Sequence, residues 1–150
     1  METAVLKRTF TVDEFHRMAE WLVRRVQEGT IVSVQDPIVL SGHTELYPDV
    51  ALLKRRSDFY SESLPRPADE FLVVEVSDTT GEYDSGVKLP RYAGSGIPEV
   101  WVVDLRERAV DVYRQPAGGE YREHQRLSAG QTVAIPGVIG QQIRVDDMLV

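Results

Sequence analysis

Two acidic residues stand in stretches of the sequence that are otherwise typical of buried strands. Asp49 opens the apolar stretch 49–53 directly after Pro48, and Glu75 lies inside the nearly continuous apolar run 71–76. A carboxylate buried without a partner costs several kcal/mol, so such groups usually pair with a base or a metal ion. If the two strands are neighbours, both carboxylates meet at one edge of the sheet, where Mg²⁺ could bind them together with water and phosphate oxygens. In the alternative interpretation, Glu75 pairs with an Arg or Lys and Asp49 caps a turn.

Lys88 is the third residue that could take part in this chemistry. It lies on a predicted helix, 84–96, that directly follows the strand of Glu75. A helix that returns over the sheet can carry the lysine back to the carboxylates. Its ammonium group could then hold an attacking water or neutralise charge that builds up on a phosphoryl group. An i, i+4 pair with Asp84 is the simpler alternative, and the two roles are compatible.

Several other chemistries are excluded or disfavoured. The chain has no cysteine, which rules out disulfides, thiolate metal sites and cysteine nucleophiles. Nucleophile elbows and phosphate-binding Gly-rich loops are absent. The histidines His16, His43 and His124 are far apart in the sequence. His43 and Glu45 could in principle bind a metal, but a solvated turn explains them better.

Length and composition predict one globular domain over residues 1–150. The chain is 42% hydrophobic and 27% charged, which is close to the globular average. Its net charge of −7 is spread evenly along the sequence, which argues against strong sequence-independent binding to nucleic acid but leaves room for a local basic groove. No apolar run approaches the roughly 20 residues of a membrane span, and the N-terminus lacks a secretory pattern. We therefore expect a cytoplasmic protein that does not bind membranes.

The order of the predicted elements indicates an α/β fold, with a mixed central sheet flanked by helices. The elements are a helix over 12–28, short strands at 31–34, 38–40 and 49–53, a strand at 71–76, the helix at 84–96, a strand at 100–104, and a C-terminal antiparallel meander at 109–114, 120–126 and 132–135.

The polar stretch 54–70 is a candidate substrate-binding loop, because a loop of this length inside a compact domain is usually functional or mobile. We expect DNA to approach along it. Its basic residues would meet phosphates near the metal edge, although they could also be merely solvated. These residues are Lys54, Arg55, Arg56 and Arg66.

The sequence resembles the Uma-two family of candidate endonucleases, which belongs to the PD-(D/E)xK restriction-endonuclease-like superfamily. The resemblance rests on Pro48-Asp49, Glu75-Val76, Tyr83-Asp84, Lys88-Leu89, Tyr92 and the stretch 96–104, and it extends to 11–20 and 145–147. It implies a restriction-endonuclease-like sheet and hydrolysis of DNA phosphodiester bonds that depends on Mg²⁺ or Mn²⁺. Asp49 and Glu75 would bind the metal, with the main-chain carbonyl of Val76 as a further ligand. The lysine of the superfamily normally stands where this chain has Ser77, so Lys88 would take its role.

One departure from the family pattern bears on the site and on assembly. A hairpin that normally follows the opening helix, and carries a further acid, is missing before Trp21. Glu20 is the candidate to replace that acid. An uncovered sheet edge or apolar patch invites a homodimer, which would also bring two sites to two DNA strands. We expect Trp21, Leu22 and Val26 at its interface, unless the helix docks over the gap and leaves a monomer.

Three functional hypotheses remain open at this point. The first is a Mg²⁺-dependent DNA endonuclease. The second is a catalytically degenerate relative that acts as a nucleic-acid-binding or structural module. The third is an unrelated α/β enzyme or ligand-binding domain. The sequence does not distinguish DNA from RNA as the substrate.

Overall fold

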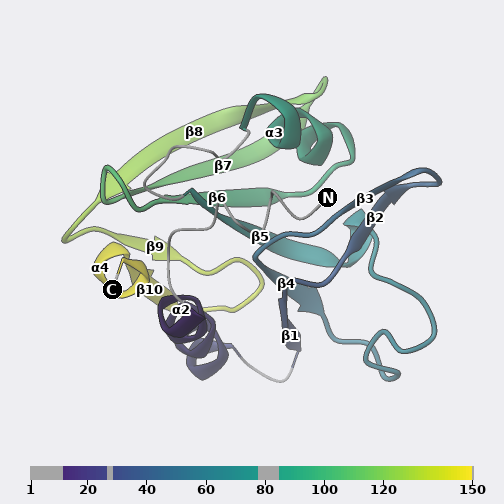
Figure 1. Cartoon of the computed structure of the whole chain (residues 1–150), viewed down its shortest axis with the longest axis horizontal. Helices are drawn as coiled ribbons and strands as arrows, with labels where there is room; N and C mark the ends of the chain where they lie inside the picture. Colours follow the sequence, from purple (N-terminus) through teal and green to yellow (C-terminus); the bar gives the residue numbers. More distant parts are fainter. Residues whose placement is uncertain (1–11, 27–28, 78–84, 150) are drawn as a thin grey trace.

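The computed structural model describes residues 12–26, 29–77 and 85–149 (Figure 1). Within these ranges the centre of the fold is a six-stranded sheet in the order β1-β4-β5-β6-β7-β8. β5 and β6 run parallel, and the other neighbours run antiparallel. The strands are β1 Thr30–Val34, β4 Val50–Lys54, β5 Glu70–Ser77, β6 Glu99–Asp104, β7 Ala109–Ala117 and β8 Glu120–Ser128. The predicted mixed central sheet is confirmed.

The remaining elements are two small hairpins and a few helices. They are α2 Val12–Arg25, β2 Ile38–Ser41, β3 Thr44–Leu46, the 3₁₀ turn η1 Pro67–Asp69, α3 Ser85–Gly94, β9 Thr132–Ala134, β10 Gln142–Arg144 and α4 Val145–Met148. β2 pairs with β3, and β9 pairs with β10. The predicted meander is therefore corrected at its end, because β9 leaves the main sheet instead of pairing with β8. β3 was not predicted.

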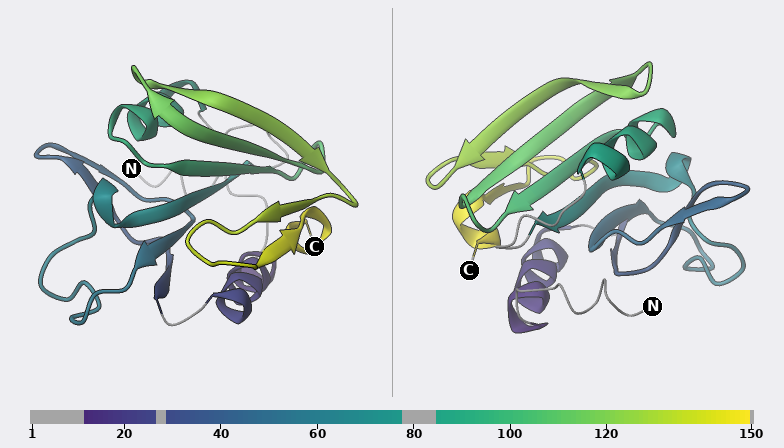
Figure 2. Two further views of the ribbon diagram at one scale, coloured as in Figure 1. Left: turned by 180° about the vertical axis from the view of Figure 1, so that it is seen from behind. Right: turned by 45° about the horizontal axis from the view of Figure 1, so that its top comes forward.

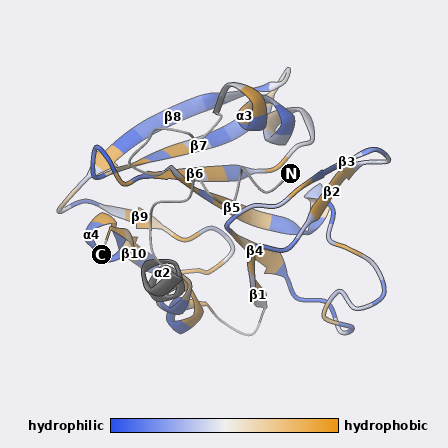
Figure 3. Cartoon of the chain, viewed as in Figure 1, coloured by the Kyte–Doolittle hydropathy of each residue, from blue (hydrophilic) through white to orange (hydrophobic). Residues whose placement is uncertain are grey.

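The elements outside the sheet cover its two faces. α2, α4 and the β9–β10 hairpin lie on one side, and α3 and the β2–β3 hairpin lie on the other (Figures 1 and 2). Because side chains alternate along a strand, one strand serves both layers. In β5, Leu72, Val74 and Val76 face α2, whereas Val73 packs with Tyr92 of α3. The edge strand β8 is largely hydrophilic (Figure 3), which discourages further strand pairing.

The opening helix docks onto its own sheet. Leu22 is fully buried in the core that α2 covers, and Trp21 and Val26 pack partly buried against it. The prediction of Leu22 as a dimer contact is therefore wrong, whereas Val23, among the side chains of this helix that the structure describes, is apolar and exposed. The homodimer itself stays a prediction.

Glu70 is a buried acid at the start of β5. Its side chain is 2% exposed, and no described residue donates a hydrogen bond to either carboxylate oxygen. Burial, with a smaller contribution from the charge of Asp69, raises the pKa of Glu70 to about 9. The folded protein therefore holds a neutral Glu70 at pH values where the unfolded chain holds a carboxylate.

This difference in pKa makes the stability of the fold depend on pH. The folded pKa is about 9 and the ordinary value is 4.5. The free energy of unfolding that burial of Glu70 costs therefore grows as the pH rises between these two values. We expect Glu70→Gln to stabilise the protein by about 3 kcal/mol at pH 8, and by much less at pH 5. Urea unfolding at both pH values measures this. If the free energy of unfolding changed with pH by the same amount in the wild type and in Glu70→Gln, the prediction would be contradicted.

Candidate active site

The register of β4 and β5 brings the two predicted acids together. Val50 pairs with Val74, so Asp49 and Glu75 are opposite each other one residue further along. Val50 and Val74 point into the core under α2, and the acids therefore point to the other face, which α3 covers. Both acids are buried, with 4% of Asp49 and 2% of Glu75 exposed. The predicted adjacency of the two strands is confirmed.

Asp49 reaches the main chain beside Glu75. The backbone N–H of Val76 donates a hydrogen bond to Oδ2 of Asp49 over 2.8 Å. This bond ties the start of β4 to the end of β5 and holds the Asp49 carboxylate next to the peptide that follows Glu75. The two carboxylates and the main chain of Val76 thus form one oxygen-rich corner of the sheet.

α3 supplies the other two groups around Glu75. Lys88 and Tyr92 are four residues apart and so share one face of the helix. The Lys88 Nζ lies 3.5 Å from Oε1 of Glu75, and the Tyr92 hydroxyl donates a hydrogen bond to Oε2 over 2.5 Å. Tyr92 is fully buried, whereas 32% of the Lys88 side chain is exposed. The lysine therefore connects the buried acids to solvent. Asp84, its alternative partner, lies outside the described residues.

The electrostatic environment of Glu75 favours an added cation. Burial and the charge of Asp49 raise its pKa, while Lys88 and the Tyr92 hydroxyl lower it; the balance brings the pKa of Glu75 to about 7. Among the described residues, the ammonium of Lys88 thus contacts Glu75 in a buried corner that also holds the Asp49 carboxylate. Hard oxygen donors at such a position suit a divalent cation. In the described part of the chain no three His, Cys, Asp or Glu side chains converge, so an ion would complete its shell with main-chain oxygen and water.

Three other candidate metal-site residues do not join this corner. Glu20 is on α2, which covers the opposite face of the sheet; its carboxylate is 63% exposed and pairs with Arg24 over 3.6 Å. The prediction that Glu20 replaces a missing acid is therefore wrong. His43 and Glu45 are exposed on the β2–β3 hairpin, and Glu45 accepts a hydrogen bond from Tyr47.

The predicted substrate loop joins β4 to β5 at the end of the pair away from Asp49. It leaves β4 after Lys54 and enters β5 at Glu70, so these two junctions lie about five residues of strand, roughly 16 Å, from Asp49. Its later part packs on β2, where the backbone N–H of Val39 donates a hydrogen bond to the carbonyl oxygen of Pro65. The expected adjacency of this loop to the carboxylates stays a prediction. Phosphate contacts by Lys54, Arg55 and Arg66 stay a prediction.

Arg56 has a structural partner within this loop. Its Nε lies 2.6 Å from Oδ1 of Asp58, and its Nη2 lies 2.6 Å from the carbonyl oxygen of Ser63. The Asp58 carboxylate also accepts bonds from the backbone N–H groups of Tyr60 and Glu62. The Arg56 guanidinium thus ties the loop together, which lowers its availability to a phosphate.

Sequence reasoning gave no role to Tyr92, although its place four residues after Lys88 was a usable signal. Residues at this spacing lie one above the other on a helix, so a lysine aimed at Glu75 brings the tyrosine with it. Arg91 was also missed. It is exposed on α3 beside Tyr92.

The mixed central sheet is that of a restriction-endonuclease-like fold. On it, two buried acids lie beside a lysine from the covering helix. Comparison with known families agrees: the sequence model of the Uma2 family, described as "Putative restriction endonuclease", matches residues 11–146. The chain belongs to this family.

Among solved structures, the fold is similar to a protein from Anabaena variabilis ATCC 29413 described as a putative nuclease belonging to DUF820. The TM-score is 0.68 at 14% identity, over 95% of this chain and 83% of that one. A search of curated proteins gives no significant match. No helix in the described ranges is long and apolar enough to cross a membrane.

Proposed function

We propose that the protein is an endonuclease that hydrolyses DNA phosphodiester bonds with the help of a divalent metal ion. The observation that carries this proposal is the convergence of Asp49, Glu75 and Lys88 on one face of the sheet, with the lysine 3.5 Å from Glu75. Family membership supports the reaction class. Retention of all three groups in one corner favours catalysis over a degenerate binding module.

Asp49, Glu75 and the main-chain carbonyl of Val76 would hold Mg²⁺ or Mn²⁺. When bound, such an ion stabilises negative charge on the phosphoryl group and makes its bound water more acidic. The hydrogen bond from Tyr92 fixes the orientation of Glu75, and the bond from the Val76 N–H fixes Asp49. These contacts hold both carboxylates in place, so little reorganisation is needed during the reaction.

Lys88 would act at the solvent-facing side of the corner. Its flexible side chain carries three N–H donors and is partly exposed. It can hydrogen-bond the attacking water while it contacts Glu75, and it can neutralise charge on the phosphate in the transition state. This role requires the Lys88 ammonium to stay in the corner when the charge of Glu75 is neutralised.

The proposal includes three further statements about the working protein. It acts in the cytoplasm. It pairs as a homodimer, because two antiparallel strands need two sites related by a two-fold axis. Basic residues of the 54–70 loop, Lys54, Arg55 and Arg66, contact DNA phosphates.

Cleavage of supercoiled plasmid DNA tests the proposed reaction. We expect nicked and linear products with Mg²⁺ or Mn²⁺, and intact plasmid in EDTA. A parallel incubation with single-stranded RNA tests the choice of DNA. A purified, folded protein that cuts neither substrate with either metal would contradict the proposal and favour the degenerate module.

A further inference from the structure

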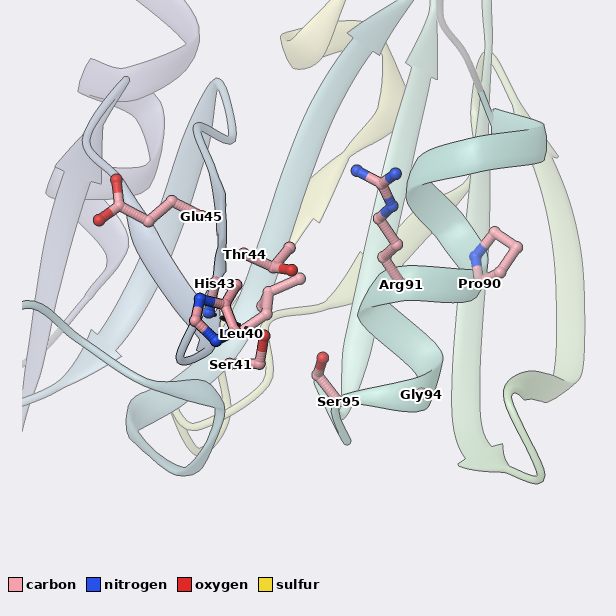
Figure 4. A pocket seen from close by; sticks show the side chains of 9 residues that line it. All are labelled: Leu40, Ser41, His43, Thr44, Glu45, Pro90, Arg91, Gly94 and Ser95. Atoms are coloured by element: carbon pink, nitrogen blue, oxygen red, sulfur yellow. Dashed lines mark hydrogen bonds between the residues drawn. The ribbon is translucent and has the colours of Figure 1, made fainter.

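A cleft separates the β2–β3 hairpin from α3 (Figure 4). Its volume is about 490 Å³, which is larger than one phosphate group requires. Ser41, His43 and Thr44 line it from the hairpin, and Arg91 and Ser95 line it from α3. It lies on the same face of the sheet as Asp49 and Glu75, because that face is the one covered by α3 and the hairpin.

Arg91 gives this cleft a positive group. The side chain is exposed, extends from α3 into the space facing the hairpin, and forms no ion pair with a described residue (Figure 4). The carboxylate lining the cleft belongs to Glu45, which points away from α3 in Figure 4 and accepts a hydrogen bond from Tyr47. The charge of Arg91 is therefore not neutralised across the cleft.

Hydroxyl groups accompany the guanidinium. Thr44 points from the hairpin toward α3, and Ser95 lies at the end of the helix (Figure 4). An arginine with nearby hydroxyl donors is the set that proteins use to hold phosphate oxygens. The protein has a net charge of −7, so a guanidinium that faces an open cleft is a local attraction for an anion on an otherwise acidic chain.

The position of Arg91 on α3 links the cleft to the acids. It follows Lys88 by three residues, which is about 4.5 Å along the helix axis. Lys88 contacts Glu75, and so does Tyr92, the residue after Arg91. A nucleic-acid strand with one phosphate at Glu75 would therefore have a neighbouring phosphate within reach of Arg91.

We propose that the cleft is a phosphate-binding subsite for a DNA strand, with Arg91 as its principal contact and Thr44 and Ser95 as additional donors. The subsite fixes the register of the strand so that the next phosphate reaches Asp49 and Glu75. This inference rests on the proposed function, since it takes DNA to be the ligand. Free phosphate shares the same chemistry and is the competing source.

Fluorescence anisotropy with a labelled DNA duplex tests the subsite, in EDTA so that binding is measured without cleavage. We expect Arg91→Ala to weaken binding about 10-fold and to lower the salt slope by about one unit, as the loss of one phosphate contact predicts. Arg91→Lys keeps the charge and should retain most of the slope. Arg106→Ala, at an exposed arginine in the β6–β7 turn, is the matched control and should bind like the wild type.

The outcomes separate this inference from the proposed reaction. Loss of binding in Arg91→Ala supports the subsite even if the wild type cuts no DNA with Mg²⁺. Equal affinity and slope for Arg91→Ala and wild type would overturn it, as would a wild-type protein that does not bind the duplex. Inorganic phosphate that binds the wild type at low millimolar concentration, and not Arg91→Ala, while duplex binding is the same in both proteins, would assign the cleft to free phosphate and overturn the DNA proposal.

Discussion

Glu75→Gln should reduce metal-dependent DNA cleavage by roughly 10³-fold, the scale on which a preorganised charge at a reacting centre acts. Gln keeps the size of Glu75 and can keep a hydrogen bond with Tyr92, but it removes the negative charge that binds the cation. The fold should not suffer, because a buried carboxylate whose pKa is raised to about 7 already costs stability. Initial rates on plasmid DNA at saturating Mg²⁺, with a parallel thermal unfolding curve, measure both effects.

Glu70→Gln is the matched control for this experiment. It makes the same chemical change at another buried glutamate on β5, five residues from Glu75. The control should cut DNA like the wild type, because Glu70 lies at the opposite end of the strand from Asp49. Equal losses in both variants would assign the effect to the fold, and full activity in Glu75→Gln would remove Glu75 from the site.

Lys88→Met should reduce cleavage by about 10²-fold while the protein still binds the metal. Met keeps the length and the apolar stem of the lysine but has no N–H donors and no charge. The carboxylates stay in place because Tyr92 and the Val76 N–H still hold them. Single-turnover rates at saturating metal isolate the chemical step from binding.

The expected separation of rate from metal affinity distinguishes Lys88 from Glu75. If Lys88 merely neutralised the acids, its loss would leave the corner more negative, so metal binding would tighten and the rate would not fall. A Lys88→Met protein with wild-type rates would show that the 3.5 Å contact with Glu75 is structural.

Local pattern was enough to predict the central sheet and the convergence of Asp49, Glu75 and Lys88. The runs around Val50 and Val74 are apolar on both faces, so a single acid in each stands out as a group that needs a partner. The helix after β5 had to return over the sheet before the parallel strand β6, and this path carries Lys88 to Glu75. Both the acids and the helix that positions the lysine could therefore be predicted from the sequence.

Other features depended on pairing that no local pattern specifies. β3 has three residues, and β9 pairs with β10 across the intervening turn, so neither has a distinctive period. The loop 54–70 is polar and basic, which the sequence shows, but its path over β2, where the Val39 N–H bonds to the Pro65 carbonyl, depends on tertiary packing. Arg56 looked available because its bonds to Asp58 and Ser63 come from the local fold of the loop.

Isothermal titration calorimetry with Mn²⁺ tests the central claim most directly, because it asks whether the acid pair binds a divalent cation at all. The wild-type protein should bind one ion at a saturable site. Asp49→Asn and Glu75→Gln should each abolish that heat, and Glu70→Gln should leave it unchanged. A wild-type titration that shows no more than dilution heat, or binding that survives in Glu75→Gln, would contradict a metal site at Asp49 and Glu75 and with it the proposed nuclease.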